Sequence, residues 1–201
     1  SSLLPAKQAK HLAAITEPKR VGELIRMIDG YEGNIVTMAA LKLMPLVFVR
    51  SLELRQAKWC DINLAEGMWK FTLTKTSVEH AVPLSHQAIK ILKDLYPYTK
   101  DREYVFYSDV SSKRILSENT LSSALRKLGI PKEEMSVHGF RAMARTLCHE
   151  RLYIKPEVIE HQLGHKVPDA LGQAYNRTRF IDDRIQLMQQ WADYLDQLKQ
   201  G

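Results

Sequence analysis

The chain has 201 residues, of which 45% are hydrophobic, so it is long enough to bury one large core. Lysine and arginine outnumber aspartate and glutamate by 29 to 23, and the net charge of +6 favours an anionic partner such as nucleic acid. Cys60 and Cys148 are isolated, which argues against a disulfide framework, and no apolar run is long enough to span a bilayer.

The first quarter of the chain is predicted to be helical. Apolar periodicity predicts amphipathic helices over residues 7–15 and 20–28, separated at Thr16-Glu17-Pro18. An apolar helix follows over 35–44 and is expected to end or kink near Pro45. The next helix is predicted to start at Ser51 as its N-cap, with Glu53 in the first turn.

In the middle of the chain, helical periodicity gives way to an alternating pattern, which predicts a small antiparallel sheet. Residues 68–73 alternate with aromatic and β-branched side chains after a turn at Glu66-Gly67, and residues 81–84 form a second extended piece. Lys75 lies near the tip of their connection. The later elements are a strand predicted at 104–107 and five helices, predicted over 85–95, 117–128, 137–150, 155–163 and 181–198. The fold class is therefore mainly α with a small antiparallel β-sheet.

A set of polar residues, each in a distinctive local frame, suits chemistry on a phosphodiester. Guanidinium groups match two nonbridging phosphate oxygens, an ammonium can protonate a leaving oxygen, and imidazoles donate hydrogen bonds or move protons. A phenol becomes a useful nucleophile when cations assist it. Two guanidiniums supply the charge of a metal ion, so neither a metal nor another cofactor is expected. The set is Arg50, Lys75, His138, Arg141, His165 and Tyr175.

Each of these residues also has an ordinary structural interpretation. Arg50 is spaced to pair with Glu53, Lys75 suits a solvated loop, and Tyr175 suits a packing position. His161 and His165 are four residues apart, as zinc ligands often are. Gly164 interrupts that helix and no third ligand is evident, so a zinc site is not expected.

Taken in order, the frames resemble those of the tyrosine recombinases, or phage integrases, over nearly the whole chain. They look closest to the branch carried by satellite prophages and pathogenicity islands. The frames are Val49-Arg50-x-x-Glu53-Leu54-Arg55, His80-Ala81-Val82-Pro83-Leu84-Ser85, Val137-His138-Gly139-Phe140-Arg141, Leu163-Gly164-His165, Ala174-Tyr175-Asn176-Arg177 and Trp191-Ala192-Asp193-Tyr194-Leu195. One departure is the turn before Arg50, where the family usually carries Thr-Gly and this chain has Leu46-Val47-Phe48-Val49.

The resemblance implies a site-specific recombinase that integrates a prophage or genomic island. Tyr175 would attack the scissile phosphate to form a 3′-phosphotyrosine, and Lys75 would protonate the leaving 5′-oxygen. Arg50 and Arg141 would hold the nonbridging oxygens, while the two histidines donate hydrogen bonds. Because the link to protein conserves the bond energy, ATP is not needed. Glu53 would orient Arg50 or His138, and the expected DNA contacts are Lys113, Arg114, Arg145 and Arg177.

The implied partner is double-stranded DNA carrying attachment sites, bound by a homotetramer in the synaptic complex. The isolated chain is compatible with a monomer, and the expected location is the bacterial cytoplasm, at the nucleoid. The family's core-binding and arm-binding domains are not visible, so residues 1–201 are expected to form the catalytic domain alone. Tyr175 is expected to serve its own active site. The last helix carries an apolar stripe suited equally to a neighbouring subunit or to its own domain: Ile185, Met188, Trp191, Leu195 and Leu198.

Three other functions fit parts of the sequence less well. A metal-dependent nuclease needs several carboxylates on a rigid frame, and the close pairs Asp182-Asp183 and Glu133-Glu134 lack a convincing third partner. A non-catalytic DNA-binding relative would not need the complete cationic set with Tyr175. A type IB topoisomerase shares the chemistry but would relax DNA as a monomer.

Overall fold

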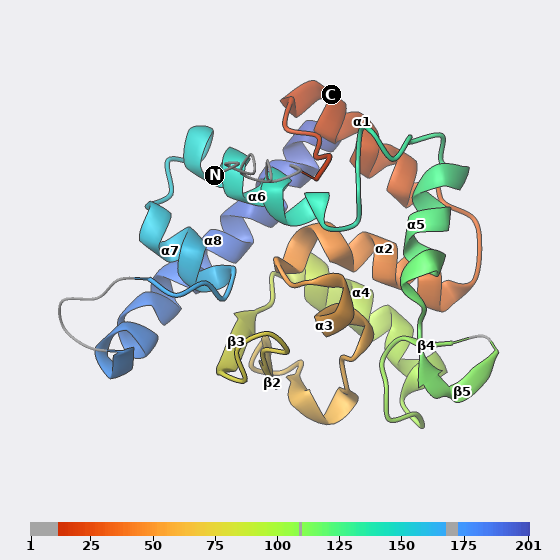
Figure 1. Cartoon of the computed structure of the whole chain (residues 1–201), viewed down its shortest axis with the longest axis horizontal. Coiled ribbons are helices and arrows are strands. Elements are labelled where there is room, and N and C mark those ends of the chain that lie inside the picture. The colour runs from red at the N-terminus through yellow and green to blue at the C-terminus, as the bar shows by residue number, and fades with distance from the viewer. Residues whose placement is uncertain (1–11, 109, 168–172) are drawn as a thin grey trace, which may run out of the picture.

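The structure is a computed structural model that describes residues 12–108, 110–167 and 173–201, apart from the side chains of Ser112 and of residues 173–179. Helices dominate these residues and two small antiparallel sheets accompany them, which confirms the predicted fold class (Figure 1). The helices are α1 (Pro18–Asp29), α2 (Ile35–Val47), α3 (Ser51–Arg55), the 3-10 helix η1 (Trp59–Asp61), α4 (His86–Thr99), α5 (Glu118–Lys127), α6 (Gly139–Glu150), α7 (Pro156–Gln162) and α8 (Gln173–Gln200). The strands are β1 (Ile62–Asn63), β2 (Met68–Thr72), β3 (Glu79–Pro83), β4 (Tyr107–Ser108) and β5 (Ser111–Ile115).

Helix α2 forms the centre of the fold because it is apolar on nearly every face. It packs against α1, α4, α5, α6 and α8, so these helices surround it. The helix continues two residues beyond Pro45, slightly further than predicted, and ends where Phe48 adopts a left-handed conformation with φ of 62°. The indole of Trp191 in α8 donates to the Pro45 carbonyl at 2.8 Å and packs edge-on against the Phe48 ring. The end of α2 is therefore held by α8.

The first sheet is a hairpin with one short extra strand. Its order is β1-β2-β3, and the register pairs Trp69 with Val82 and Phe71 with His80. Lys75 lies in the turn that joins β2 to β3, as predicted. The second sheet pairs β4 with β5, and β5 was not predicted because its sequence, Ser-Ser-Lys-Arg-Ile, has no apolar alternation.

Several predicted helix boundaries were wrong at their first residues. Residues 12–15 of the predicted helix 7–15 are not helical, and the rest of it lies outside the described residues. Glu17 and Pro18 do not break a helix but start α1, since the Glu17 carboxylate accepts from the backbone amides of Lys19 and Arg20. Arg50, not Ser51, holds the N-cap position of α3.

Helix α8 begins at Gln173, eight residues before the predicted start, so Tyr175 lies in its first turn rather than ahead of it. The stretch Asn-Arg-Thr-Arg at 176–179 is polar and carries no apolar periodicity that would have extended the prediction. Further along, Met188, Trp191 and Leu195 are buried within this chain, while Ile185 is 46% exposed. The apolar stripe therefore packs mainly on its own domain. In the described part of the chain, no helix is both long and apolar enough to cross a membrane.

Candidate active site

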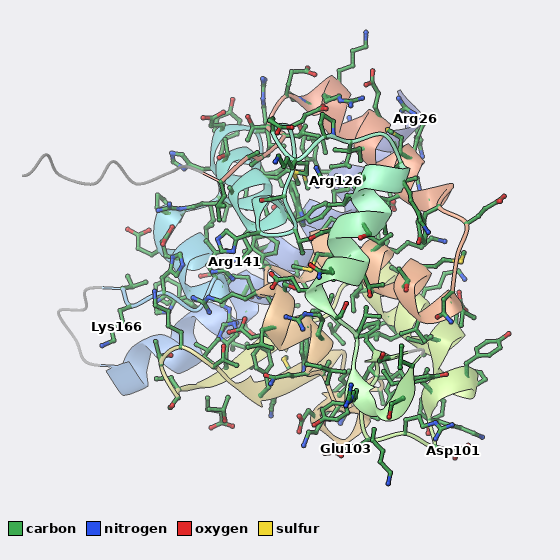
Figure 2. The ribbon with its side chains drawn as sticks, turned by 45° about the vertical axis from the view of Figure 1, so that its right-hand side comes forward. Arg26, Asp101, Glu103, Arg126, Arg141 and Lys166 are labelled. Atoms are coloured by element: carbon green, nitrogen blue, oxygen red, sulfur yellow. The ribbon has the colours of Figure 1, made fainter. Side chains whose placement is uncertain are left out.

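Arg141 is a buried guanidinium held by the carboxyl-terminal ends of two helices. It lies near the start of α6, is 5% exposed, and Figure 2 shows it within the body of the molecule. Its Nη1 donates to the carbonyl of Phe48, which caps α2, and its Nη2 donates at 2.9 Å to the carbonyl of Leu163, which caps α7. Helix carboxyl ends carry partial negative charge, so both contacts stabilise the cation. Burial, followed by the charge of Arg50, lowers the pKa of Arg141 to about 10, which leaves it protonated at neutral pH.

Arg50 is held by a carboxylate beneath it. Its backbone N–H donates to Glu53 Oε2 at 2.8 Å, and its Nη1 donates to Glu53 Oε1 at 2.9 Å. The Glu53 side chain is 1% exposed and the Arg50 side chain 21%. A buried carboxylate needs such a partner, and the two hydrogen bonds that Arg50 donates fix it at the N-cap of α3. The placement suits the orienting role predicted for Glu53, which stays a prediction.

The two histidines are exposed, whereas Arg141 is buried. His138 is at the N-cap of α6 and its side chain does not cap the helix. The surrounding protein partly desolvates its ring, and this effect, followed by the charges of Arg141 and Arg50 and by His165, lowers its pKa. His165 Nε2 lies 3.2 Å from Arg141 Nη2. Arg50, His138, Arg141 and His165 thus meet where α3, α6 and the end of α7 converge.

Glu160 is a member of this site that the sequence analysis missed. Its Oε2 lies 2.6 Å from His165 Nδ1, and its Oε1 accepts from Arg145 Nε at 2.5 Å. Burial raises the pKa of Glu160, but the hydrogen bonds from His165 and Arg145 outweigh that effect and lower it overall. No sequence motif marked Glu160, because its relation to Arg145 depends on how α6 packs against α7.

The elements that carry Lys75 and Tyr175 border a pocket of about 270 Å³ beside His165. Thr76 and Val78 of the β2–β3 connection line one side, and Ile181 of α8 lines another. Lys75 itself is exposed, and within the described residues its side chain makes no hydrogen bond or ion pair. The backbone of Tyr175 belongs to the first turn of α8, and its side chain lies outside the described part. The structure therefore gathers four of the six predicted residues.

At the wall of this pocket, a buried network ties β3, α7 and α8 together. His80 Nε2 donates to the Gln162 carbonyl at 3.1 Å. Arg184 donates through Nε to Gln162 Oε1 at 2.9 Å and through Nη2 to the carbonyl of Ala81. Burial, followed by the nearby charge of Arg184, lowers the pKa of His80 to about 3, so this imidazole is neutral. The network holds the hairpin and α8 in position at the pocket.

The predicted DNA contacts are dispersed. Lys113 and Arg114 are exposed on β5, which Figure 1 shows on the opposite side of the molecule from α7. Arg145 is engaged by Glu160, although its side chain is 60% exposed. The side chain of Arg177 lies outside the described residues. Where the structure describes side chains, no three histidine, cysteine, aspartate or glutamate residues gather as a metal site would require.

Comparison with known proteins places these observations in a family. Residues 14–180 match the Phage integrase family. The integrase of Enterobacteria phage P4 is 35% identical over 96% of this chain and 47% of its own length, and the IntB protein of Escherichia coli K12 is 34% identical over 90% and 50%. The chain thus spans about half the length of these curated relatives.

Solved structures agree on the fold. The integrase of mycobacterium phage Brujita superposes with a TM-score of 0.69 at 17% identity, covering 97% of this chain and 65% of that protein. A lambda integrase tetramer bound to a Holliday junction gives 0.61 at 19% identity, covering 85% and 52%. The match in sequence and the shared fold together show that this chain belongs to the phage integrase family.

Proposed function

We propose that this chain is the catalytic part of a tyrosine-type site-specific recombinase that integrates a prophage or genomic island. One observation carries the proposal: two arginines and two imidazoles, far apart in sequence, converge beside the elements that bear Lys75 and Tyr175. Such a cluster matches a phosphodiester, whose two nonbridging oxygens need cationic hydrogen-bond donors. The similarity to integrases supports the same activity and does not favour a topoisomerase.

In the proposed reaction, the Tyr175 oxygen attacks phosphorus and the bond from phosphorus to the 5′-oxygen breaks. Lys75 gives its proton to the leaving oxygen, and a histidine takes the proton of the phenol. Arg50 and Arg141 neutralise the charge that grows on the nonbridging oxygens. Reversal, with a 5′-hydroxyl of another strand as nucleophile, restores the phosphodiester, so no ATP is consumed.

The wider assembly is part of the same proposal. Residues 1–201 would form one catalytic domain, which the continuous hydrophobic core supports. The substrate would be double-stranded DNA with attachment sites, recombined by a tetramer in the bacterial cytoplasm at the nucleoid. A lambda integrase tetramer on a Holliday junction shows that the shared fold supports such an assembly in that protein.

Covalent capture tests the reaction. The chain is incubated with supercoiled plasmid in EDTA, the reaction is stopped with detergent, and protein-linked DNA is measured. We expect an adduct with the parent chain and none with Tyr175→Phe. Tyr153→Phe is the matched control, because Tyr153 is 86% exposed and has no proposed role. An adduct that survives Tyr175→Phe, or cleavage that requires added magnesium, contradicts the proposal.

A further inference from the structure

We infer that Glu160 is a positioning residue for His165, which it holds so that Nε2 faces Arg141. This inference rests on the proposed function, in which Arg141 binds the scissile phosphate and a histidine takes the proton of the phenol. Its geometric basis stands in the structure itself: one carboxylate joins His165 through Oε2 and Arg145 through Oε1.

The carboxyl end of α7 brings Glu160 and His165 together. Leu163 caps the helix, and Gly164 follows with φ of 71°, a left-handed conformation that favours glycine. The N–H of Gly164 donates to the carbonyl of His161, and the N–H of His165 donates to the carbonyl of Glu160 at 3.0 Å. This hydrogen-bond pattern is a Schellman motif, which brings the second residue after the cap beside the third residue from the helix end. An apolar pair usually occupies these two positions, whereas here they hold Glu160 and His165.

The hydrogen bonds of the His165 ring each have one possible direction. The guanidinium of Arg141 only donates, so His165 Nε2 accepts from it and the ring proton lies on Nδ1. Nδ1 then donates to Glu160 Oε2 at 2.6 Å. A carboxylate on one ring nitrogen sets the tautomer and the orientation of the other nitrogen. Glu160 therefore decides which nitrogen His165 presents to the site.

Arg145 holds the Glu160 carboxylate in place. Arg145 lies four residues after Arg141, on the same side of α6, and its Nε binds Glu160 Oε1. Arg141 meanwhile binds the Leu163 carbonyl at the end of α7. Two successive turns of α6 are thus tied to α7, one through the helix end and one through Glu160. This assigns Arg145 to holding the carboxylate.

The experiment compares Glu160→Ala, Glu160→Gln and Glu157→Gln in the plasmid adduct assay. Glu157 is the matched control, because it lies on the same helix and its side chain is exposed. We expect Glu160→Ala to slow adduct formation by about 10- to 100-fold, the usual cost of losing such a supporting contact. Glu160→Gln keeps an acceptor for Nδ1–H and should lose less, and Glu157→Gln should match the parent chain.

Two further measurements separate positioning from folding. Combined with His165→Ala, the Glu160→Ala change should add almost nothing, because a residue that acts through His165 has no effect without it. In ¹⁵N NMR spectra of the DNA-free chain, the His165 signals, identified by their loss in His165→Gln, should show the Nδ1–H tautomer in the parent. They should show a mixture of tautomers in Glu160→Ala.

The results of these experiments distinguish a failure of the inference from a failure of the proposed function. Additive losses in the double variant, or an unchanged His165 tautomer in Glu160→Ala, overturn the inference. If the parent chain forms no adduct while Glu160→Ala alters the tautomer, the proposed function fails and the positioning contact stands. Parental adduct rates in both Glu160 variants overturn the catalytic importance of the contact.

Discussion

The arginine cluster and the β2–β3 hairpin turn represent opposite ways of holding a functional cation. Arg141 is 5% exposed and its guanidinium is bound by two helix-end carbonyls, while Arg50 is paired with a buried carboxylate. Lys75 is exposed in a turn and is not paired within the described residues. A group that must match two fixed oxygens gains from a rigid setting. A group that donates a proton to a departing oxygen needs only a side chain that can extend to that oxygen. Substitutions in the arginine cluster should therefore change both stability and catalysis, whereas substitutions in the hairpin turn should change catalysis alone.

The largest effect is expected from Arg141→Lys. An ammonium cannot donate to the Phe48 and Leu163 carbonyls and also face a phosphate as a planar fork does. We expect adduct formation to fall by at least about a thousandfold. The free energy of unfolding in urea should fall by about 1–3 kcal/mol, because buried acceptors lose a partner.

The control for that change is Arg151→Lys, an exposed arginine at the end of α6. It should leave both measurements unchanged. A fully active Arg141→Lys chain would show that the helix-end contacts do not prepare the site.

Lys75→Ala should reduce activity without reducing stability. The loss of a general acid slows proton transfer by roughly 10²–10⁴-fold. Because the Lys75 side chain makes no hydrogen bond or ion pair with the described residues, the urea midpoint should stay at the parent value. A DNA substrate with a 5′-phosphorothiolate, whose sulfur leaves without protonation, should restore most of the rate. Failure of that substrate to rescue cleavage would remove Lys75 from the role of acid.

Glu53→Gln should reduce both the free energy of unfolding and the rate of adduct formation. It leaves Arg50 without its charge partner in a largely buried position, and we expect a loss of about 2–3 kcal/mol in the free energy of unfolding. Adduct formation should fall as Arg50 loses its orientation. Glu79→Gln, at an exposed carboxylate on β3, is the matched control. Equal stability of the two variants would refute a supporting role for Glu53.

His80 should make the stability of the chain depend on pH. Its folded pKa of about 3 lies below an unfolded value near 6.5, so the folded state binds fewer protons. The resulting stability is fully present above pH 6.5 and is lost as the pH falls towards 3. Arg184, Arg141 and Arg50 all disfavour the imidazolium there. Between pH 7 and pH 5 the parent should lose about 2 kcal/mol more than His80→Gln. Identical pH profiles in urea unfolding would contradict this assignment.

Much of the architecture was predictable from local patterns. The apolar periodicity of α1, α4 and α5, the serine caps at Ser85 and Ser117, and the hairpin around Lys75 were all found in nearly their observed places. Strand β5 and the first two turns of α8 were missed because their polar sequences carry no periodic signal. The left-handed Phe48 has a similar explanation. Nothing local marks it, since its ring is held by Trp191, 143 positions further along the chain.

By itself, the sequence determined which chemistry the chain can offer, because the residue types and their frames specify guanidiniums, imidazoles and a phenol in a set order. Only the tertiary structure decided how they are supported. The carbonyls that bind Arg141 belong to α2 and α7, and the carboxylate behind His165 is also held from α6. Hydrogen bonds act over about 3 Å in space, whatever the separation along the chain. Contacts between residues 22, 93 and 103 positions apart therefore leave no periodic trace in the sequence.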